Sequence, residues 1–337
     1  MRITNKMITT KYIRSLNTLS SDLDKLNTQI ASGRAFSKAS ENTSAAVKAF
    51  QIRRDLSKTE GYQANIAHAQ SSLTNSESAL MHIEELMQEA KVKILVGNTV
   101  TSSVDERKIV ATELRSIQNQ LFQTLNSQAS DVYYFGGSNT DNQPFTLDTN
   151  GKLAYNGESL WQLDPVVDEL TIKGLKEDSM YVDIGLGLRM NGTDVDRSSV
   201  FQYSIPGINI VGSGSTTLAD GTEVSNNLYD LLGQIAASLE SGTYTYDMVD
   251  QLSAKLSESS KEVIYKLTEV GSKTSYLDFM TDRFDTRTLD LQENQVNVEG
   301  ADPARTIIKF KSQEVAYSAA LQMGTKIIQP SIFDFMS

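Results

Sequence analysis

The segment DVYYFGGSNTDNQPF, residues 131–145, is where the sequence changes character. Before it, apolar residues recur at helical spacing, and after it glycines and short alternating runs dominate. Gly136 and Gly137 directly follow three aromatic residues, and a polar run then ends at Pro144 and Phe145. Because glycine and proline end regular helices, the segment predicts a corner at which a helical region gives way to a different fold.

Apolar residues near the N-terminus predict a first helix, which Gly33 ends. They alternate spacings of three and four residues, which places them on one face of the helix. These residues are Leu16, Leu19, Leu23, Leu26 and Ile30.

Two more helices are predicted before the corner, over 62–96 and roughly 104–132. No glycine or proline interrupts residues 62–96, so at about 1.5 Å per residue this helix is some 50 Å long. The residues expected on its core face are Leu73, Leu80, Ile83 and Met87.

The segment between residues 133 and 242 holds fourteen of the chain's 20 glycines, and this density argues against long helices there. Short alternating runs at 170–173, 181–184 and 201–205 predict strands between turns. The sequence therefore predicts a compact β-rich insert over 136–224.

A short amphipathic helix is predicted near residue 224, followed by a long helix with a strict seven-residue repeat, which is typical of a supercoiled helix packed on others. Gly300 ends this helix, and Asp302 with Pro303 marks the start of another. The repeat that we expect in the core of the rod comprises Val263, Val270, Leu277, Phe284 and Leu291.

The chain is thus predicted to be mainly α, a long helical rod or coiled-coil bundle of N- and C-terminal segments with a β-rich central insert. We divide it into a terminal helical domain (1–43 plus 301–337), a rod of long helices (44–135 plus 225–300) and an outward-facing insert (136–224). Two terminal helices alone leave much apolar surface exposed, so we expect their stripes to be buried between subunits. The predicted assembly residues are Leu16, Leu19, Leu23, Leu26, Ile30, Ile307, Phe310, Tyr317, Leu321, Ile328, Phe333 and Phe335.

The composition of the chain argues against several kinds of partner and site. The chain has 337 residues, a net charge of −11 and no run of Lys or Arg, which argues against a nucleic-acid or anionic-membrane partner. Without cysteine it has no disulfide and no thiolate metal site. Basic residues interrupt the apolar stretches of 1–14, so we expect no cleavable signal peptide.

Catalytic, metal and cofactor sites are not expected. His68 and His82 are fourteen residues apart, about 21 Å along a helix, and no third ligand is suggested. The run Gly271-Ser-Lys-Thr274 lacks the upstream glycine of a phosphate-binding loop. No nucleophile, base and orienting group come together in the sequence.

Five motifs follow one another along the chain: Leu26–Arg34 (LNTQIASGR), Tyr134–Gly137 leading to Pro144-Phe145, Val270–Lys273 (VGSK), Tyr317–Gln322 (YSAALQ) and Gln329–Phe335 (QPSIFDF). In this order they resemble the motifs of the flagellin family. They cover about 1–145 and 225–337, while the insert matches nothing specific. The run Ser40–Ser44 departs from the acidic pair and proline that this family usually has there, which puts the turn before the long helix in question.

The resemblance implies a non-enzymatic subunit of the bacterial flagellum. The Phe-Gly-Gly corner and the Asp-Phe ending favour the branch that joins the hook to the filament. Such a subunit would be exported through the flagellar type III channel and would be extracellular. Its expected partners are further copies of itself in a ring or helical assembly, a second hook-associated junction protein, the flagellin subunits of the filament and a cytoplasmic export chaperone.

Three alternatives remain. A filament flagellin shares the two ends of the chain more loosely. A flagellin-borne enzyme would need a metal-ligand cluster within 136–224, where no histidine occurs. A secreted coiled-coil adhesin would not need apolar stripes at both extreme ends.

Overall fold

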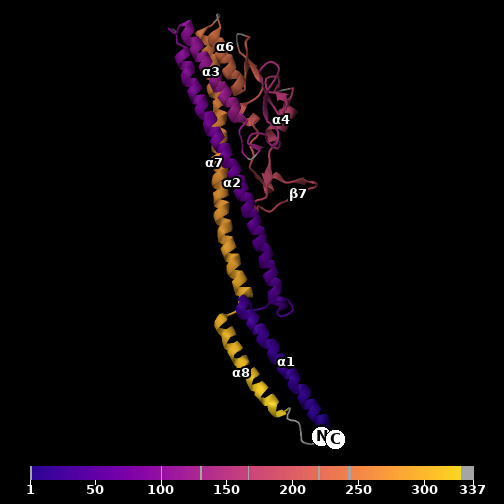
Figure 1. Ribbon diagram of the computed structural model, residues 1–337. Helices are drawn as coiled ribbons and strands as arrows, with labels where there is room; N and C mark the ends of the chain where they lie inside the picture. Colours follow the sequence, from indigo (N-terminus) through magenta and orange to yellow (C-terminus); the bar gives the residue numbers. More distant parts are fainter. Residues whose placement is uncertain are drawn as a thin grey trace. The chain divides into compact units, whose positions relative to one another are not determined.

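Long helices make up most of the computed structural model, which describes residues 2–99, 101–129, 131–165, 167–218, 221–241 and 244–327. The mainly α class predicted from the sequence is confirmed. The long helices are α1 (Arg2–Ser32), α2 (Thr43–Gly97), α3 (Val104–Leu125), α6 (Leu228–Glu240), α7 (Tyr246–Glu299) and α8 (Pro303–Ile327) (Figure 1).

Short antiparallel strands lie in the chain between α3 and α6, as the glycine-rich composition predicts. They form one three-stranded sheet and several two-stranded pairs in the described residues, together with the short helices α4 (Glu169–Glu177), α5 (Ile208–Val211) and the 3₁₀ turn Arg197–Ser199. The pairs are β1 (Gln128–Ala129) with β2 (Val132–Tyr133), β6 (Tyr181–Val182) with β9 (Phe201–Gln202), β7 (Met190–Asn191) with β8 (Asp194–Val195), and β10 (Ser215–Thr217) with β11 (Glu223–Ser225); the three-stranded sheet is β3 (Phe145–Leu147), β4 (Leu153–Tyr155) and β5 (Glu158–Ser159).

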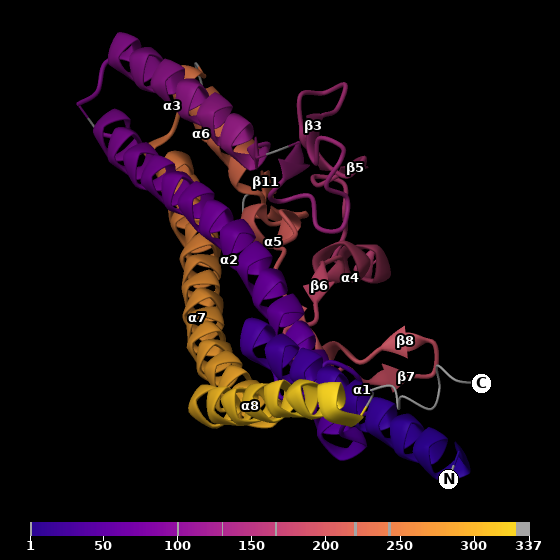
Figure 2. The same ribbon diagram turned by 60° about the horizontal axis from the view of Figure 1, so that its bottom comes forward.

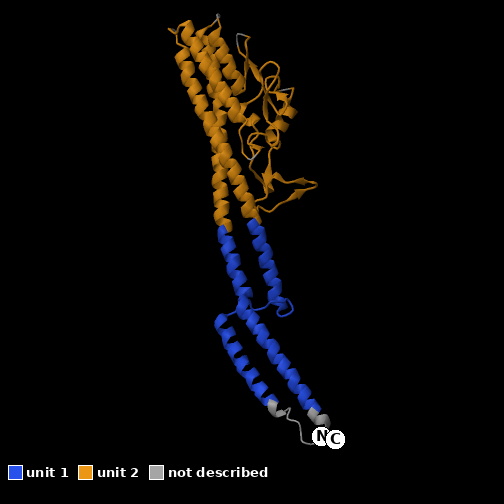
Figure 3. Ribbon diagram, viewed as in Figure 1, with its two compact units in different colours: residues 1–60, 285–337 blue, residues 61–284 orange. Residues whose placement is uncertain are grey.

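The chain divides into two compact units (Figure 3). Unit 1 comprises residues 1–60 and 285–337, and unit 2 comprises residues 61–284. Helices α2 and α7 each contribute residues to both units. The finer division into three domains, with a separate insert over 136–224, stays a prediction.

One continuous apolar core holds unit 2 together, and it combines the long helices with the strands. Within it α3 and α6 lie side by side (Figure 1 and Figure 2). The fully buried members of the predicted rod core are Leu73, Leu80, Ile83, Met87, Val263, Val270, Leu277 and Phe284. Leu291, the next position in the seven-residue repeat, lies in unit 1 and is only half-buried.

The predicted strand at 170–173 is wrong, because these residues belong to helix α4. The backbone N–H of Ile172 donates to the carbonyl of Asp168, and Ile172 and Leu175, three positions apart, both pack on the core. A four-residue alternating run fits one turn of helix as well as a strand, so spacing alone could not separate the two.

The predicted helix over 104–132 begins correctly but is too long at its end. Ser103 and Glu106 form a reciprocal capping box at its start. At the other end Asn126 leaves the helix, and its side-chain amide donates to the carbonyl of Phe122 at 3.1 Å and to that of Phe145 at 3.1 Å. Its side-chain oxygen accepts from the N–H of Phe145 at 3.0 Å. Asn126 therefore ends the helix by holding the first strand of the three-stranded sheet.

The aromatic-glycine corner is a buried crossing point of the chain. The hydroxyl of Tyr155 donates to the carbonyl of Phe135 at 3.0 Å, and the N–H of Gly207 donates to the same carbonyl at 2.9 Å. Gly136 pairs antiparallel with Pro206 alongside this contact. A side chain at Gly207 would overlap the ring of Phe145, so this crossing requires glycine. The corner thus joins the entry to the β-rich region with a segment some seventy residues later.

Replacing Gly207 with alanine is expected to destabilise unit 2. The new methyl group must displace the fully buried Phe145 ring, and overpacking of this kind costs typically about 1–3 kcal/mol. Gly174→Ala is the matched control, because this glycine lies inside α4 with open space around it and alanine is the better helix former. Thermal unfolding should show a lower Tm for Gly207→Ala only. Equal Tm values would mean that the crossing point is not tightly packed.

Candidate functional site: the terminal helix pair and its base

The terminal helices α1 and α8 of unit 1 pack against each other along their length. The hydroxyl of Tyr12 donates to the carbonyl of Ala320 at 2.9 Å. Gly324, one turn further along α8, leaves room for the Tyr12 ring, because a side chain there would overlap its hydroxyl. The amide of Gln313 donates to the carboxylate of Asp22 at 3.4 Å. These contacts fix the register of the two helices.

The contact between the two helices covers only one stripe of each. On α8 this stripe recurs at spacings of three and four residues, and its members are Thr306, Phe310, Gln313, Tyr317, Ala320 and Gly324. On α1 the corresponding half-buried residues include Leu16, Leu19, Leu23 and Leu26. The predicted residues Ile30, Ile307 and Leu321 sit beside these stripes and are exposed.

Large apolar side chains remain exposed on both helices. Burial of one such side chain stabilises by about 1.5–3 kcal/mol, so this surface is costly to leave in water. The prediction from the sequence followed a single apolar stripe and therefore missed several of these residues. Apolar neighbours of that stripe, such as Ile308, could have indicated a wider apolar face. The exposed residues are Met7, Ile8, Ile13, Ile30, Ile307, Ile308, Val315, Leu321 and Met323. The predicted interface residues Ile328, Phe333 and Phe335 lie outside the described residues, and the role of the whole set stays a prediction.

A short antiparallel bridge closes the base of the terminal helices. Gly33 ends α1 in the left-handed region with φ +66°, and its N–H donates to the carbonyl of Gln29. Arg34 then pairs with Gly300: the N–H of Ala35 donates to the carbonyl of Glu299 at 2.7 Å, and that of Ala301 donates to the carbonyl of Gly33 at 2.9 Å. Two segments that are far apart in the sequence, at Arg34 and Gly300, are therefore joined where α1 ends and α8 is about to begin.

A buried carboxylate reinforces this bridge. The side chain of Glu299 is 5% exposed, and its Oε2 accepts from the guanidinium of Arg53 at 2.5 Å. The Nε of Arg34 lies 3.8 Å from the same oxygen. The hydrogen bond to Glu299 raises the pKa of the Arg53 guanidinium, so Arg53 stays charged. Neither Arg53 nor Glu299 was singled out from the sequence, because only the fold brings them together.

Two adjacent residues form the turn that precedes α2. The carboxylate of Glu41 accepts from the N–H groups of Ser37 and Lys38, and the bond from Ser37 is the main cause that lowers the pKa of Glu41. Asn42 caps the helix, with its side-chain oxygen accepting from the N–H of Ala45 at 3.1 Å. This turn, which the sequence left in question, is held by polar side chains without the proline of the family pattern.

Known proteins that resemble this chain in sequence are proteins of the bacterial flagellum. The model of the bacterial flagellin N-terminal helical region matches residues 3–140. Flagellar hook-associated protein 3 of Salmonella typhimurium is 22% identical over 342 residues, covering 99% of both chains, and its Escherichia coli counterpart is 21% identical with the same coverage. Residues 3–140 thus match the flagellin family, and the relatives of full length are flagellar hook-associated proteins.

Solved structures show the same fold. A flagellar hook-associated protein from Vibrio parahaemolyticus superposes with a TM-score of 0.60 at 18% identity, covering 77% of this chain and all of that one. The flagellar junction protein of Legionella pneumophila gives 0.54 at 13% identity, covering 75% of this chain and all of that one. In this chain the Ser32-Gly33-Arg34 motif has a physical role, because it forms the bridge to Gly300.

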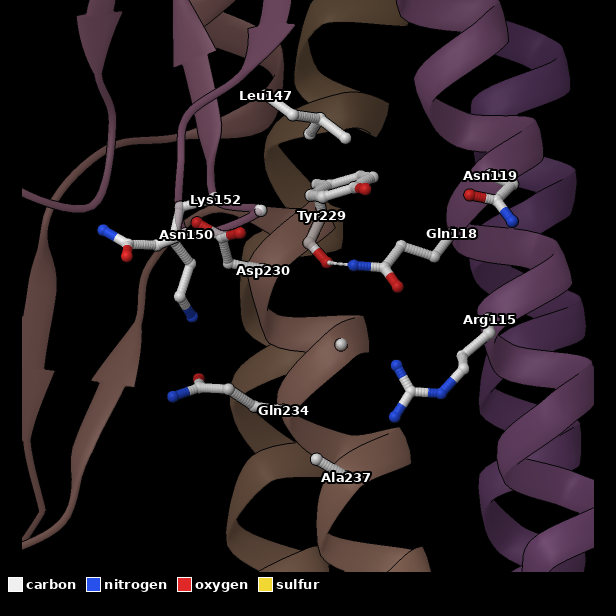
Figure 4. A pocket seen from close by; sticks show the side chains of 12 residues that line it. Arg115, Gln118, Asn119, Leu147, Asn150, Lys152, Tyr229, Asp230, Gln234 and Ala237 are labelled. Carbon is white, nitrogen blue, oxygen red and sulfur yellow. Dashed lines mark hydrogen bonds between the residues drawn. The ribbon is translucent and has the colours of Figure 1, made fainter.

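The cavity shown in Figure 4 lies within unit 2, between α3, α6 and the β3–β4 hairpin, with a volume of about 460 Å³. Gln118 crosses it and donates to the carbonyl of Tyr229 at 2.9 Å, over Gly233, whose missing side chain gives Gln118 room. Arg115 is bound by Glu240 at 2.8 Å. The Nζ of Lys152 lies 3.8 Å from the centre of the Trp161 ring. These polar groups thus bind other groups of the protein: Gln118 and Arg115 join α3 to α6, and Lys152 contacts Trp161.

Asp230 is the buried titratable group of this cavity. Its carboxylate accepts from the N–H of Leu153 at 3.3 Å and from the amide of Asn227 at 2.8 Å. Burial raises the pKa of Asp230 above its ordinary value, and the bond from Asn227 and the charge of Lys152 oppose that rise. Asp230 therefore connects the first turn of α6 to strand β4.

The two histidines lie apart. The ring of His68 packs edge-on against Tyr203, and His82 lies 3.7 Å from Glu85 one turn along α2. Among the residues that the structure describes, no three His, Cys, Asp or Glu side chains gather as a metal site would require. Within the same residues, no helix has the length and hydropathy of a membrane span.

Removing the buried ion pair at the base is expected to destabilise unit 1. Arg53→Ala leaves the buried Glu299 carboxylate without its main partner, which costs about 3–5 kcal/mol when both groups are buried and less here because Arg53 is partly exposed. Arg54→Ala is the matched control, since this neighbouring arginine is exposed and its ion pair is with Asp55. Chemical unfolding followed by helix content should lose stability only in Arg53→Ala. Parallel losses in both variants would contradict the role of Glu299.

Asp230 should make a pH-dependent contribution to the stability of unit 2. Its pKa is raised in the folded state, so the folded chain binds the proton more tightly than the unfolded chain. Relative to Asp230→Asn, the wild type should therefore lose stability as pH rises from about 4 through the raised pKa. Asp230→Ala, which removes the acceptors for Leu153 and Asn227, should cost about 1–3 kcal/mol near pH 4, and this cost should shrink at higher pH as the wild type loses stability. The measurement is urea unfolding from pH 4 to 8, and a constant difference between wild type and Asp230→Asn would contradict it.

Proposed function

We propose that this chain is a structural subunit of the bacterial flagellum that joins the hook to the filament. Its full-length similarity to two proteins named flagellar hook-associated protein 3 supports this function, and so does the fold that it shares with a flagellar junction protein. Filament flagellin, the alternative within the same family, is less favoured, because the matches of full length carry the hook-associated name.

The observation that carries the proposal is the apolar surface that α1 and α8 leave exposed. A pair of helices can bury one face of each, and the remaining face requires neighbouring copies. Contacts of this kind repeat head-to-tail when the two contacting surfaces differ, and they generate a ring or an open helical tube. The terminal helices would then line the inner wall of that tube.

Assembly, and not catalysis, is the activity that we assign to this chain. Apart from further copies of itself, the proposed partners are a second hook-associated protein on the hook side and flagellin subunits on the filament side. A cytoplasmic chaperone would hold the chain before export through the flagellar channel. The working location is extracellular, in the flagellum.

The decisive variant is Leu321→Asp. Leu321 is exposed in the terminal pair, so an aspartate there meets water in the monomer and should change its Tm little. In the assembly the charge would be desolvated without a partner, a penalty of several kcal/mol per subunit. Leu277→Asp is the control, since Leu277 is fully buried in unit 2 and its replacement should lower the Tm strongly. The comparison is thermal unfolding of both variants beside filament attachment in cells.

Electron microscopy with a specific gold-labelled antibody tests the location itself. We expect label at the hook–filament boundary in wild-type cells and free hooks in cells producing Leu321→Asp. Label along the whole filament would support the flagellin alternative and overturn the proposal. If Leu321→Asp melts the isolated subunit as strongly as Leu277→Asp does, the stripe belongs to the monomer core and the account of assembly is wrong.

A further inference from the structure

Unit 1 carries a second set of exposed apolar residues, away from the terminal pair. On the first part of α2, residues 43–60, Val47 is 57% exposed and Phe50 is 61% exposed. On the last part of α7, residues 285–299, Leu289 is 67% exposed and Val296 is 68% exposed. These four side chains are not part of any core of unit 1, and their exposure needs an explanation of its own.

Each pair lies on a continuous helical face that points away from the buried side of its own helix. On α2 the face consists of Val47, Phe50, Arg54 and Lys58, at spacings of three and four, whereas the buried side carries Ala46 and Ala49. We call this the α2 face. On α7 the corresponding face consists of Asp285, Leu289, Glu293 and Val296, whereas Leu291, Gln295 and Val298 are more buried. We call this the α7 face.

The two faces carry opposite charge. The α2 face adds Arg54 and Lys58 to its two apolar residues, and the α7 face adds Asp285 and Glu293. The surrounding segments agree: residues 43–60 hold four basic and two acidic side chains, a net charge of +2, and residues 285–299 hold one basic and four acidic side chains, a net charge of −3. The side chain of Arg54 is 67% exposed and pairs with its neighbour Asp55 at 3.5 Å, so it can turn to an external carboxylate.

We propose that the α2 face of one subunit docks on the α7 face of a second copy of this chain. The inference rests on the proposed function and adds to it a contact outside the terminal helices. Val47 and Phe50 would pack against Leu289 and Val296, and Arg54 and Lys58 would approach Glu293 and Asp285. In a pair joined in this way, one copy keeps an unused α7 face and the other keeps an unused α2 face, so the contact repeats without closing on a dimer.

Charge favours this pairing over the other arrangements of the same two surfaces. Two α2 faces placed together would bring Arg54 and Lys58 of both copies into contact, and two α7 faces would do the same with carboxylates. Only the mixed pairing buries the apolar residues and pairs the charges at once. Both halves of a complementary contact are present on one chain, which is why the occupant is a second copy and not a different protein.

Disulfide trapping tests the contact directly, because the chain has no cysteine of its own. Purified Phe50→Cys and Leu289→Cys chains are mixed, concentrated until they assemble, and oxidised briefly. We expect mixed disulfide dimers in at least tenfold excess over a control mixture of Lys48→Cys and Asn294→Cys, which are exposed positions on the same helices but off the two faces. Mixed dimers no more abundant than in the control, or dimers mainly between identical variants, overturn the proposal.

Charge reversal provides an independent arm. Arg54→Glu and Glu293→Lys should each raise the protein concentration needed for assembly by about tenfold, because each places like charges across the contact. The chain carrying both substitutions should assemble near the wild-type concentration, since the pairing is restored with its signs exchanged. All three should keep the wild-type Tm, because both positions are exposed. Failure of the double variant to recover would overturn the pairing.

The same variants separate this inference from the proposed function. Mixed disulfides in purified assemblies, without label at the hook–filament boundary in cells, would leave the contact standing and remove the junction function. Label at the boundary, with no mixed disulfide in the assembled protein, would leave the junction function standing and overturn the contact between the α2 face and the α7 face. A disulfide in cells from Phe50→Cys or Leu289→Cys to a different flagellar protein, in place of a second copy, would overturn the choice of occupant.

Discussion

Two helices packed side by side can each bury only one face, and this limit determines which residues of α1 and α8 in unit 1 stay exposed. The half-buried leucines of α1 meet the stripe of α8 that runs through Phe310 and Tyr317. Everything beside that stripe stays in water, including large residues such as Ile308 and Val315. A soluble monomer gains nothing from such an arrangement, whereas a subunit that must join others gains its contact surface from it.

Unit 2 follows a different principle, because its long helices and its strands share one core. The carbonyl of Phe135 receives hydrogen bonds from both Tyr155 and Gly207, so the chain entering the β-rich region is tied to the sheet and to a later crossing segment. Asp230 adds a second tie, between α6 and strand β4. These hydrogen bonds connect α6, strand β4 and the entry to the β-rich region within unit 2.

Spacing of apolar residues predicted the long helices well, since runs of thirty residues or more leave little ambiguity. Short elements were less predictable: the run at 170–173 fits either a strand or a turn of helix, and α3 ends early only because Asn126 bonds to Phe145. In the contact between α1 and α8, Thr306 and Ala320 are polar or small, so the spacing of large apolar residues could not identify them. The predicted assembly residues Ile307 and Leu321 lie beside them and are exposed. The Arg53–Glu299 ion pair could not be predicted from the sequence, since it joins residues that are 246 positions apart.

The bridge between Arg34 and Gly300 has a consequence for the order in which the chain folds. Tyr12 and Ala320 are 308 positions apart, so the terminal pair is among the most non-local contacts that a chain of this length can make. Closing so long a loop costs entropy, and contacts of high sequence separation form late. During synthesis α1 therefore waits without its partner until α8 has been made. The residues between the terminal helices can therefore fold first, and α1 and α8 pack together only after α8 has been synthesised.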